Sequence, residues 1–320
     1  MKDAASIALF VLAVAVTTLL IESGVALNFI MMALYATLLA QAWNMLGGFG
    51  GQFSFGHALF FGSGAYVQAM AQLHGGINAW AALPLAVGAA AAVGAFVGAL
   101  AFRYGLKGSY FALITLAFAE VFRILALQLP FTGAGVGLML PLRAAASNLQ
   151  FASPRGFVLL VLGFVALALG VTAWLRHSRF GAQLQAVRDN EDAARALGID
   201  PLRTKLAACV LSAAFMGAAG AFYLQVFQYI DPAIAFGPGT SVEALLGAIV
   251  GGMGTLWGPV LGALALHALS DLTRNLFGAL PGINMVIYGA VLVLIVMFMP
   301  RGIAGIGQSV RALWRGGKGG

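Results

Sequence analysis

Long, uninterrupted runs of apolar residues recur along this chain, and each is long enough to cross a lipid bilayer as a helix. One helical span needs about 20 mainly apolar residues, because the hydrocarbon core is roughly 30 Å thick. A chain with 61% hydrophobic and only 8% charged residues cannot hide such runs from water. Transmembrane barrels use short segments that alternate between apolar and polar residues, so these runs indicate helices. The sequence therefore predicts an all-α, polytopic integral membrane protein.

The apolar runs between Gly, Pro and charged residues predict ordinary membrane spans. They cover residues 6–22, 27–47, 55–73, 79–102, 109–129, 156–175, 205–228 and 283–299. Before the last span, residues 242–271 form two shorter apolar pieces, separated by the glycines and proline of residues 251–259. We expect two short or re-entrant helices there, and hence about 8 to 10 membrane helices in all. The first run resembles a secretory signal, but a second span follows so closely that we expect a retained first span.

The distribution of Lys and Arg predicts which side of the membrane each loop occupies. With a cytoplasmic N-terminus, thirteen basic residues fall on the cytoplasmic side, three fall outside, and Arg123 lies within a span. Cytoplasmic connections collect basic residues, so we expect both termini in the cytoplasm. Residues 1–300 then form one transmembrane domain, with an external loop at 130–155, a cytoplasmic loop at 176–204 and a cytoplasmic tail at 301–320. The net charge of +7 comes from these connections, which indicates contact with membrane lipid and no nucleic acid.

Several classes of chemistry lack the residues that they need. The single cysteine, Cys209, excludes an internal disulfide, and the four histidines are scattered without the spacing of metal ligands. The sequence contains no phosphate-binding G-x-x-x-x-G-K-[ST] loop, and its cluster Gly133–Gly137 belongs to the external loop. Paired carboxylates, or a nucleophile beside a base, do not stand at a membrane face. We therefore expect no catalytic residues, no metal and no bound cofactor.

The cytoplasmic loop contains a short amphipathic segment at residues 181–197, for which we expect a single helix. Its apolar residues fall near one helical face, and opposite charges lie four residues apart on the rest. The apolar residues are Leu184, Val187, Ala194 and Leu197, and the charge pairs are Arg188 with Asp192 and Glu191 with Arg195. Gly198 would end this helix. Such a helix could lie on lipid headgroups, but its nearly balanced charges favour a protein partner.

Two glycine-rich segments, residues 47–57 and 251–259, interrupt the two halves of the chain at corresponding places. Paired interruptions of this kind are typical of translocation sites that are built from broken helices. Each could equally be a tight connection between adjacent spans. In the first segment, Gln52, Ser54 and His57 could meet a passing zwitterion or could bind the backbone groups that a broken helix leaves free.

Ionisable residues inside the predicted spans are few. Glu120 and Arg123 lie three residues apart, and hence on one helical face. Each costs at least about 2.5 kcal/mol near the centre of a membrane helix, so such residues indicate a structural or functional role. The two side chains could neutralise each other and fix the helix, or they could line a path. Glu243 and His267, near the second glycine-rich segment, leave the same choice open.

Four spaced motifs stand in order along the chain. The motif of the cytoplasmic loop comprises Arg179–Gly181, Ala186–Glu191, Ala193–Ala194 and Leu197–Ile199. The other three comprise Gly51–Ala58 with Phe60–Gly62 and Gly64–Tyr66, Gly108–Leu113 with Thr115–Glu120 and Arg123, and Gly251–Gly254 with Gly258–Pro259 and Gly262–Ala263. Together, over residues 28–300, they resemble the LivM family, the M-type permeases of ABC importers for branched-chain amino acids. The resemblance implies an ABC importer permease fold in a bacterial inner membrane.

The resemblance also implies a function and partners. It implies uptake of leucine, isoleucine, valine or related small solutes with a second, LivH-like permease, two cytoplasmic ATPases of the LivG and LivF kind, and a periplasmic substrate-binding protein. The partner ATPases would hydrolyse ATP, so this chain would not be an enzyme. The residues implied in coupling to an ATPase are Arg179, Phe180, Gly181, Val187, Arg188, Asp189, Glu191, Ala194 and Gly198. The candidates for the translocation path are Gln52, Ser54, His57, Glu120, Arg123, Gly252 and Gly254.

The chain departs from the family pattern at two places. Ala134 stands where a second glycine is usual, and Ser270–Arg274 stands where the family often carries a Pro-Glu pair before a basic residue. These departures bear on the substrate, so a permease for urea, short amides or other amino acids stays an alternative. The alternative class is an ion-coupled secondary transporter, which would need intramembrane acids for proton or sodium coupling. A membrane scaffold without transport would leave the two glycine-rich segments unexplained.

Overall fold

The computed structural model describes residues 2–277, 286–287, 289–290, 293 and 302–305, and helices dominate these residues. The long helices are α1 (Lys2–Leu20), α2 (Gly24–Asn44), α3 (His57–Leu73), α4 (Ala79–Arg103), α5 (Ser109–Gln128), α6 (Pro154–His177), α9 (Pro201–Phe227), α11 (Pro238–Gly251) and α12 (Gly258–Phe277). The shorter helices are η1 (Met45–Phe49, a π-helical turn), η2 (Pro130–Thr132), η3 (Ala134–Val136), η4 (Ala146–Asn148), α7 (Arg179–Asp189), α8 (Glu191–Ala196) and α10 (Pro232–Phe236).

Seven helical segments of the described chain are long and apolar enough to cross a membrane. They confirm the prediction of an all-α, polytopic membrane protein. One of these segments joins α10 to α11 and runs from Pro232 to Gly251, so it begins earlier than the apolar piece predicted from residue 242. The span predicted at 283–299 and the tail predicted at 301–320 fall largely outside the described residues.

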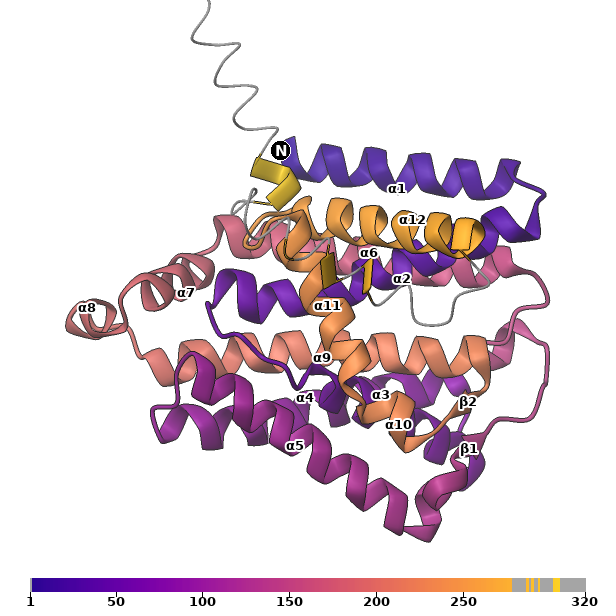
Figure 1. Ribbon diagram of the computed structural model, residues 1–320, viewed down its shortest axis with the longest axis horizontal. Helices are drawn as coiled ribbons and strands as arrows, with labels where there is room; N and C mark the ends of the chain where they lie inside the picture. The colour runs from indigo at the N-terminus through magenta and orange to yellow at the C-terminus, as the bar shows by residue number, and fades with distance from the viewer. Residues whose placement is uncertain (1, 278–285, 288, 291–292, 294–301, 306–320) are drawn as a thin grey trace, which may run out of the picture.

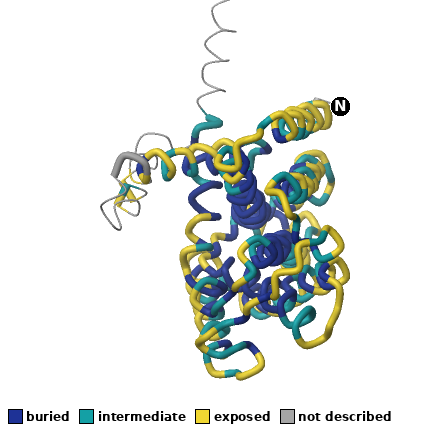
Figure 2. The backbone as a smooth tube through the Cα atoms, turned by 90° about the vertical axis from the view of Figure 1, so that its right-hand side faces the viewer, coloured by how far each residue is buried: buried dark blue, intermediate teal, exposed yellow. Residues whose placement is uncertain are grey.

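The long helices lie side by side, with α2 and α9 inside the bundle and α1 and α5 at opposite edges (Figure 1). In the apolar windows of α2 and α9, 67% of residues are buried, compared with 6% in α1 and 28% in α5. Figure 2, which looks along the helices, shows the buried residues gathered on the central helices. Each edge helix therefore has a broad face that the other described residues leave open.

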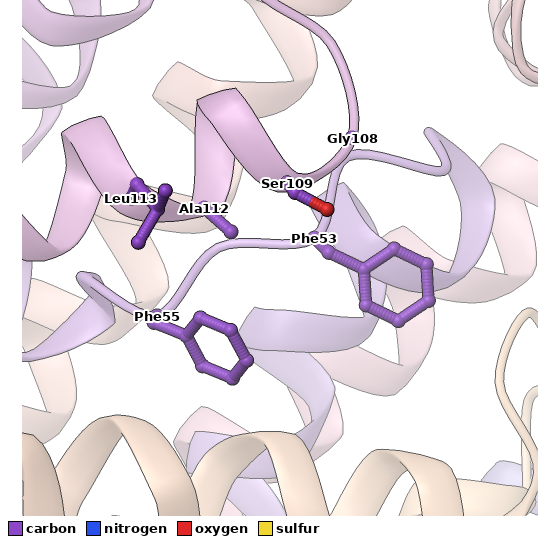
Figure 3. Close-up of a pocket in the computed structure, with 6 residues that line it drawn as sticks. All are labelled: Phe53, Phe55, Gly108, Ser109, Ala112 and Leu113. Atoms are coloured by element: carbon purple, nitrogen blue, oxygen red, sulfur yellow. The ribbon is translucent and has the colours of Figure 1, made fainter.

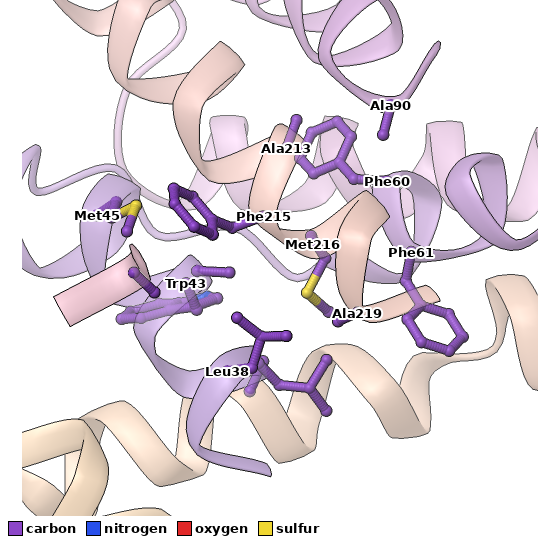
Figure 4. Close-up of a cluster of buried hydrophobic side chains, with 14 of the residues drawn as sticks. Leu38, Trp43, Met45, Phe60, Phe61, Ala90, Ala213, Phe215, Met216 and Ala219 are labelled. Atoms are coloured by element: carbon purple, nitrogen blue, oxygen red, sulfur yellow. The ribbon is translucent and has the colours of Figure 1, made fainter. Parts of the chain in front are cut away.

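Bulky side chains fill the centre of the bundle between α2, α3 and α9 (Figure 4), and glycines let the helix backbones approach each other there. Trp43, Phe60 and Met216 are fully buried there. Gly64 of α3 lies directly on the backbone of Gly217 in α9, where a Cβ would overlap the carbonyl group. Membrane helices commonly approach through such small residues, because lipid leaves van der Waals packing as the main attraction between them.

A small antiparallel pairing joins two connections at one end of the bundle. Strand β1 (Leu138–Met139), between α5 and α6, pairs with β2 (Tyr229–Ile230), between α9 and α10. The N–H of Leu140 also donates to the carbonyl oxygen of Gln228 at 2.8 Å. This pairing lies at the end of the molecule opposite α7 and α8 (Figure 1).

Candidate functional site

The two glycine-rich breaks, residues 45–56 and 252–257, meet at the end of α2. The side chain of Asn44 binds the second break twice. Its Oδ1 accepts a hydrogen bond from the N–H of Gly254 at 2.8 Å, and its Nδ2 donates to the carbonyl oxygen of Thr255 at 3.1 Å. The last residue of α2 thus holds the two breaks together.

The two backbones touch where glycine leaves space. A Cβ at Gly48 would overlap the side chain of Asn44 and lie 2.5 Å from the backbone nitrogen of Gly254. Gly51, Gly252 and Gly254 have φ angles of 65°, 118° and 70°, in a region that favours glycine. These glycines therefore allow direct contact between the two breaks, and they allow the turns within each break.

Arg188 of α7 reaches the same junction. Its Nη1 donates to the carbonyl oxygen of Gly48 at 3.0 Å, and its Nε donates to Oδ1 of Asp189 at 3.1 Å. The aliphatic part of the side chain packs on Gly51, and a Cβ at Gly254 would lie 3.5 Å from Nη1. One side chain of the loop therefore contacts both breaks.

The loop forms two helices, α7 and α8, so the prediction of a single helix over residues 181–197 is wrong. Asn190 separates them with an extended backbone, at φ −157° and ψ 106°. Its Oδ1 caps α8 by accepting hydrogen bonds from the N–H groups of Asp192 at 3.1 Å and Ala193 at 3.0 Å. This turn also keeps Asp192 from Arg188, so the ion pair predicted between them is not formed.

Glu191, the first residue of α8, anchors the loop to two other elements. Its Oε2 accepts a hydrogen bond from Nζ of Lys205 in α9 at 2.6 Å and lies 3.0 Å from Nζ of Lys107, between α4 and α5. Its predicted pair with Arg195 is present at 3.5 Å. Burial raises the pKa of the Glu191 carboxyl group, but the hydrogen bonds and charges of Lys205 and Lys107 outweigh burial and hold that pKa below its usual value.

The inner side of the loop packs on the bundle. Its buried apolar residues are Leu184, Val187 and Ala194. Phe180 stacks on Trp174 of α6 with ring centroids 5.8 Å apart, and Gly181 lies against the carbonyl oxygen of Leu175. Leu197, predicted on the same face, is instead 81% exposed. It ends α8 beside Gly198, whose positive φ of 83° turns the chain.

The outer side of α8 forms an exposed surface that was not predicted from the sequence. Asp192 and Arg195 have side chains that are 85% and 63% exposed, next to Leu197. The signal for this surface was present in the sequence, because Leu197 directly precedes the terminating glycine and the helix turns back after it. The loop therefore has an inner side that is anchored and an outer side that mixes charge with one large apolar residue.

The polar residues predicted in the first break are buried and bound to protein. Gln52 donates to a backbone carbonyl of the same break at 3.1 Å, and the carbonyl of Ser54 accepts from Nε1 of Trp43 at 2.9 Å. Nε2 of His57 lies 2.9 Å from Oγ of Ser212 in α9. The bonds of Gln52 and Trp43 satisfy backbone carbonyl groups of the break, as the alternative of satisfied backbone groups predicts, whereas Oε1 of Gln52 is buried without a hydrogen-bond partner among the described residues. A role for these residues in a path stays a prediction.

The first break turns two aromatic side chains outward. Phe53 and Phe55 are 37% and 39% exposed, whereas Gln52 and Ser54, which alternate with them, are buried, as an extended backbone requires. The two rings border a hollow of about 410 Å³ at the start of α5 (Figure 3). Its other lining residues are Gly108, Ser109, Ala112 and Leu113. Apolar residues within a polar, glycine-rich motif were a signal for this hollow that sequence reasoning did not use.

The two charged residues of α5 pair with each other, as their spacing predicts. Nε of Arg123 donates to Oε2 of Glu120 at 2.8 Å, and Nη2 donates to Oε1 at 2.6 Å. The pair lies on the open face of α5, with 30% of the Arg123 side chain and 51% of the Glu120 side chain exposed. Glu243 lies in α11, and His267 lies in α12 with its ring 5.0 Å from that of Phe29.

The fold and the site together define a class of protein. A helical membrane bundle contains two broken segments that meet, and a structured loop contacts both of them through one arginine. In the part of the chain that the structure describes, His, Cys, Asp and Glu form no group that could hold a metal ion. These are the features of a membrane transport permease.

Comparison with known proteins places this permease. The family model described as "Branched-chain amino acid transport system / permease component" matches residues 25–296. The chain belongs to this family of permease components. The LivM permease protein of Salmonella typhimurium is 29% identical over 297 residues, which are 85% of this chain and 68% of that protein. The LivM protein of Escherichia coli K12 is 30% identical over 291 residues, which are 83% of this chain and 67% of that protein.

A second group of relatives carries the name LivH. The probable branched-chain amino acid transport permease protein LivH of Methanocaldococcus jannaschii is 32% identical over 169 residues, which are 50% of this chain and 52% of that protein. The predicted resemblance to the LivM family is thereby confirmed, and the H-type permeases are its relatives. No solved structure matches the chain significantly.

Proposed function

We propose that this chain is one of two permease subunits of an ATP-driven ABC importer that takes up leucine, isoleucine and valine. Family membership supports the permease role, and the names of the LivM and LivH relatives support the substrate class. The partners are a LivH-like permease, two cytoplasmic ATPases and a periplasmic binding protein. The chain lies in a bacterial inner membrane with both termini in the cytoplasm, in keeping with its basic residues. ATP is hydrolysed by the partners.

The observation that carries this proposal is the hydrogen bond from Arg188 to the carbonyl oxygen of Gly48, at the contact with Gly254. A partner that moves α7 pulls on the first break, and the second break moves with it because Asn44 holds the two together. A two-state element that an outside partner can bias is the physical requirement for coupling. ATP binding therefore changes the breaks without any nucleotide site in this chain.

The predicted coupling residues divide into three groups, and the docking surface for the ATPase lies beside them. Phe180, Gly181, Val187, Glu191 and Ala194 face the bundle and hold the loop in place. The ATPase docks on the outer side, which we define as the tip surface: Asp192, Arg195 and Leu197. Arg188 and its neighbour Asp189 transmit the movement, and Arg179 and Gly198 mark the ends of the loop.

The path passes the two breaks. Gln52 and Ser54 lie in the first break, His57 begins α3 directly after it, and Gly252 and Gly254 lie in the second break. Glu120 and Arg123 on α5 are the remaining path candidates.

The binding protein makes most of the substrate selection, so short amides, urea and other amino acids remain substrates to be compared with leucine in the same assay. An importer also needs a closed path between cycles, and buried, bonded residues in the first break suit that state.

Co-purification tests the tip surface directly. The permease pair is co-expressed with the two ATPases, and Leu197→Asp is combined with Arg195→Glu. We expect the ATPases to be lost while the permeases still elute as a single species. The matched control changes the same residue types at the opposite end of the molecule, Leu142→Asp with Arg143→Glu, and should retain the ATPases. Full recruitment by the tip variant would refute docking at this surface.

Uptake into proteoliposomes tests the class of transporter. With ATPases, binding protein and ATP, labelled leucine should accumulate, and removal of ATP should abolish accumulation. An ion-coupled secondary transporter predicts the opposite pattern. Accumulation of leucine by the permease alone, driven by a proton or sodium gradient, would contradict the ATP-driven assignment.

A further inference from the structure

The open face of α5 carries charge where a membrane helix can least tolerate it. Glu120 and Arg123 lie near the midpoint of a helix that runs from Ser109 to Gln128. Their pair uses Nε and Nη2 of Arg123, so Nη1 has no hydrogen-bond partner among the described residues. Both side chains remain exposed, at 30% and 51%. A guanidinium group with an unmet donor is costly in lipid, because hydrocarbon neither solvates the charge nor accepts the hydrogen bond.

The opposite edge of the bundle shows what a lipid-facing helix of this chain looks like. The exposed large residues of α1 are Leu9, Leu12, Val16, Leu19 and Leu20. No charged residue lies between Asp3 at its start and Glu22 after its end. The other described residues leave both edge helices open, but these two faces differ: the exposed large residues of α1 are apolar, a composition that hydrocarbon accepts without cost, whereas the α5 face carries an ion pair.

The α5 stripe around the ion pair also has the shape of a helix contact. Leu113, Leu116, Ala117, Glu120 and Ile124 follow at spacings of three and four, so they share one face. Ala117 leaves a shallow place between larger neighbours, and small residues of this kind let a second helix approach. Leu113 also lines the hollow of Phe53 and Phe55 (Figure 3). Whatever covers the stripe therefore also closes the hollow beside the first break.

We infer that this α5 face, defined by Leu113, Leu116, Ala117, Glu120, Arg123 and Ile124, is the seam against the second permease subunit, a LivH-like chain. The inference rests on the proposed function, which supplies a partner inside the membrane. A related permease on this face would exclude lipid from the ion pair. It would also supply a polar group that accepts a hydrogen bond from Nη1 of Arg123. The hollow beside the first break then lies between the two subunits.

Photo-crosslinking in native membranes tests the seam. The crosslinker p-benzoylphenylalanine replaces Leu113, Leu116 or Ile124 on α5, and Leu9, Leu12 or Val16 on α1 as the matched controls, with both permeases and both ATPases co-expressed. The products are purified through a tag on this chain and identified by mass. We expect adducts between the two permeases from α5 and none from α1. Lipid adducts alone from α5, an adduct with a second copy of this chain, or permease adducts from α1 would each overturn the inference.

A paired substitution gives a second readout. The double variant Glu120→Leu with Arg123→Leu removes this ion pair. Both residues belong to α5 and the pair links it to no other helix among the described residues, so we expect the bundle to keep its fold. If this face is the seam, the double substitution leaves the partner's polar group without its hydrogen bond. We therefore expect co-purification of the second permease to fall about tenfold. Unchanged co-purification would place the face in lipid. In the crosslinking preparations, the bound ATPases are detected on the same gel as the adducts. Permease adducts without bound ATPases would count against the proposed function, whereas bound ATPases without permease adducts would count against the seam.

Discussion

The two glycine-rich breaks share a composition, but different bonds hold them. The second break has internal bonds in addition to those from Asn44 of α2: Oγ1 of Thr255 donates to the carbonyl oxygen of Gly252 at 2.8 Å and accepts from the N–H of Gly258 at 3.0 Å. A turn with hydrogen bonds of its own keeps its shape when its surroundings move. The second break is therefore a fixed turn between two helices.

The first break depends on other elements. The carbonyl of Ser54 accepts its hydrogen bond from Trp43 of α2, and the carbonyl of Gly48 accepts from Arg188 of α7. Its backbone after η1 is extended and makes no ladder with a neighbour. The first break can therefore change its shape in response to the loop, whereas the second break keeps its internal turn and moves with the first through Asn44.

The largest expected effect comes from separating the two breaks with Gly48→Ala. The added Cβ meets the backbone of Gly254, which cannot rotate away. We expect a loss of about 3 kcal/mol in the free energy of unfolding, measured as the thermal midpoint in detergent. Gly88→Ala on α4 has nothing within 4 Å of the new Cβ and should change stability by less than about 0.5 kcal/mol. Equal stability of the two variants would mean that the breaks do not touch.

A smaller effect is expected from Glu191→Gln, which loosens the loop that positions Arg188. The change leaves Lys205, only 4% exposed, without its anion. We expect a loss of about 2 kcal/mol and faster proteolysis of the loop. Adding Lys205→Met should restore much of the stability, because no unpaired charge then remains buried. Asp192→Asn, at a site that is 85% exposed, is the control. A neutral Glu191→Gln variant would contradict the anchoring role.

The internal bonds of the second break are tested by Thr255→Val, which keeps the shape of the side chain and removes both of its hydrogen bonds. We expect a loss of about 1.5 kcal/mol. Ser54→Ala in the first break removes one side-chain bond of 3.3 Å and leaves the backbone contact with Trp43, so about 0.5 kcal/mol is expected. If Ser54→Ala costs as much as Thr255→Val, the two breaks are held in the same way.

The smallest expected effect is that of pH on the loop anchor. The pKa of Glu191 lies below its ordinary value of 4.5 in the folded protein, so its stabilising contribution is complete above that value and is lost as pH falls through the lower, folded pKa. Between about pH 8 and pH 5, hydrogen exchange of the α8 amides should therefore show no loss of protection beyond the intrinsic change in rate. Opening of α8 within this range would show that another group controls the anchor.

Hydropathy predicted the helices well, because the bilayer fixes their length and composition. The run at 79–102 corresponds to α4 (Ala79–Arg103), and the run at 109–129 to α5 (Ser109–Gln128). The turn at Asn190 was not predicted, because apolar and charged residues stay in phase across it. A side chain that caps a helix is a local bond, and hydropathy does not report it.

The candidate site was only partly predictable. The glycine-rich segments were found from composition, and the pairing of Glu120 with Arg123 follows from their spacing on one helix. The contact of Gly48 with Gly254 joins residues far apart in sequence, so it depends on how the bundle packs. The target of Arg188 is likewise set by packing, which explains why a local pair with Asp192 was expected instead.

The central claim is that Arg188 transmits movement from the loop to the breaks, and the number of leucine molecules imported per ATP hydrolysed tests it most directly. The ratio is measured in proteoliposomes for Arg188→Met and for Arg203→Met, a control whose side chain is 86% exposed and pairs with Asp200 on its own helix turn. The account predicts that Arg188→Met keeps its ATPases but lowers the ratio about tenfold, while Arg203→Met does not change it. An unchanged ratio in Arg188→Met, with the ATPases bound, would contradict the account.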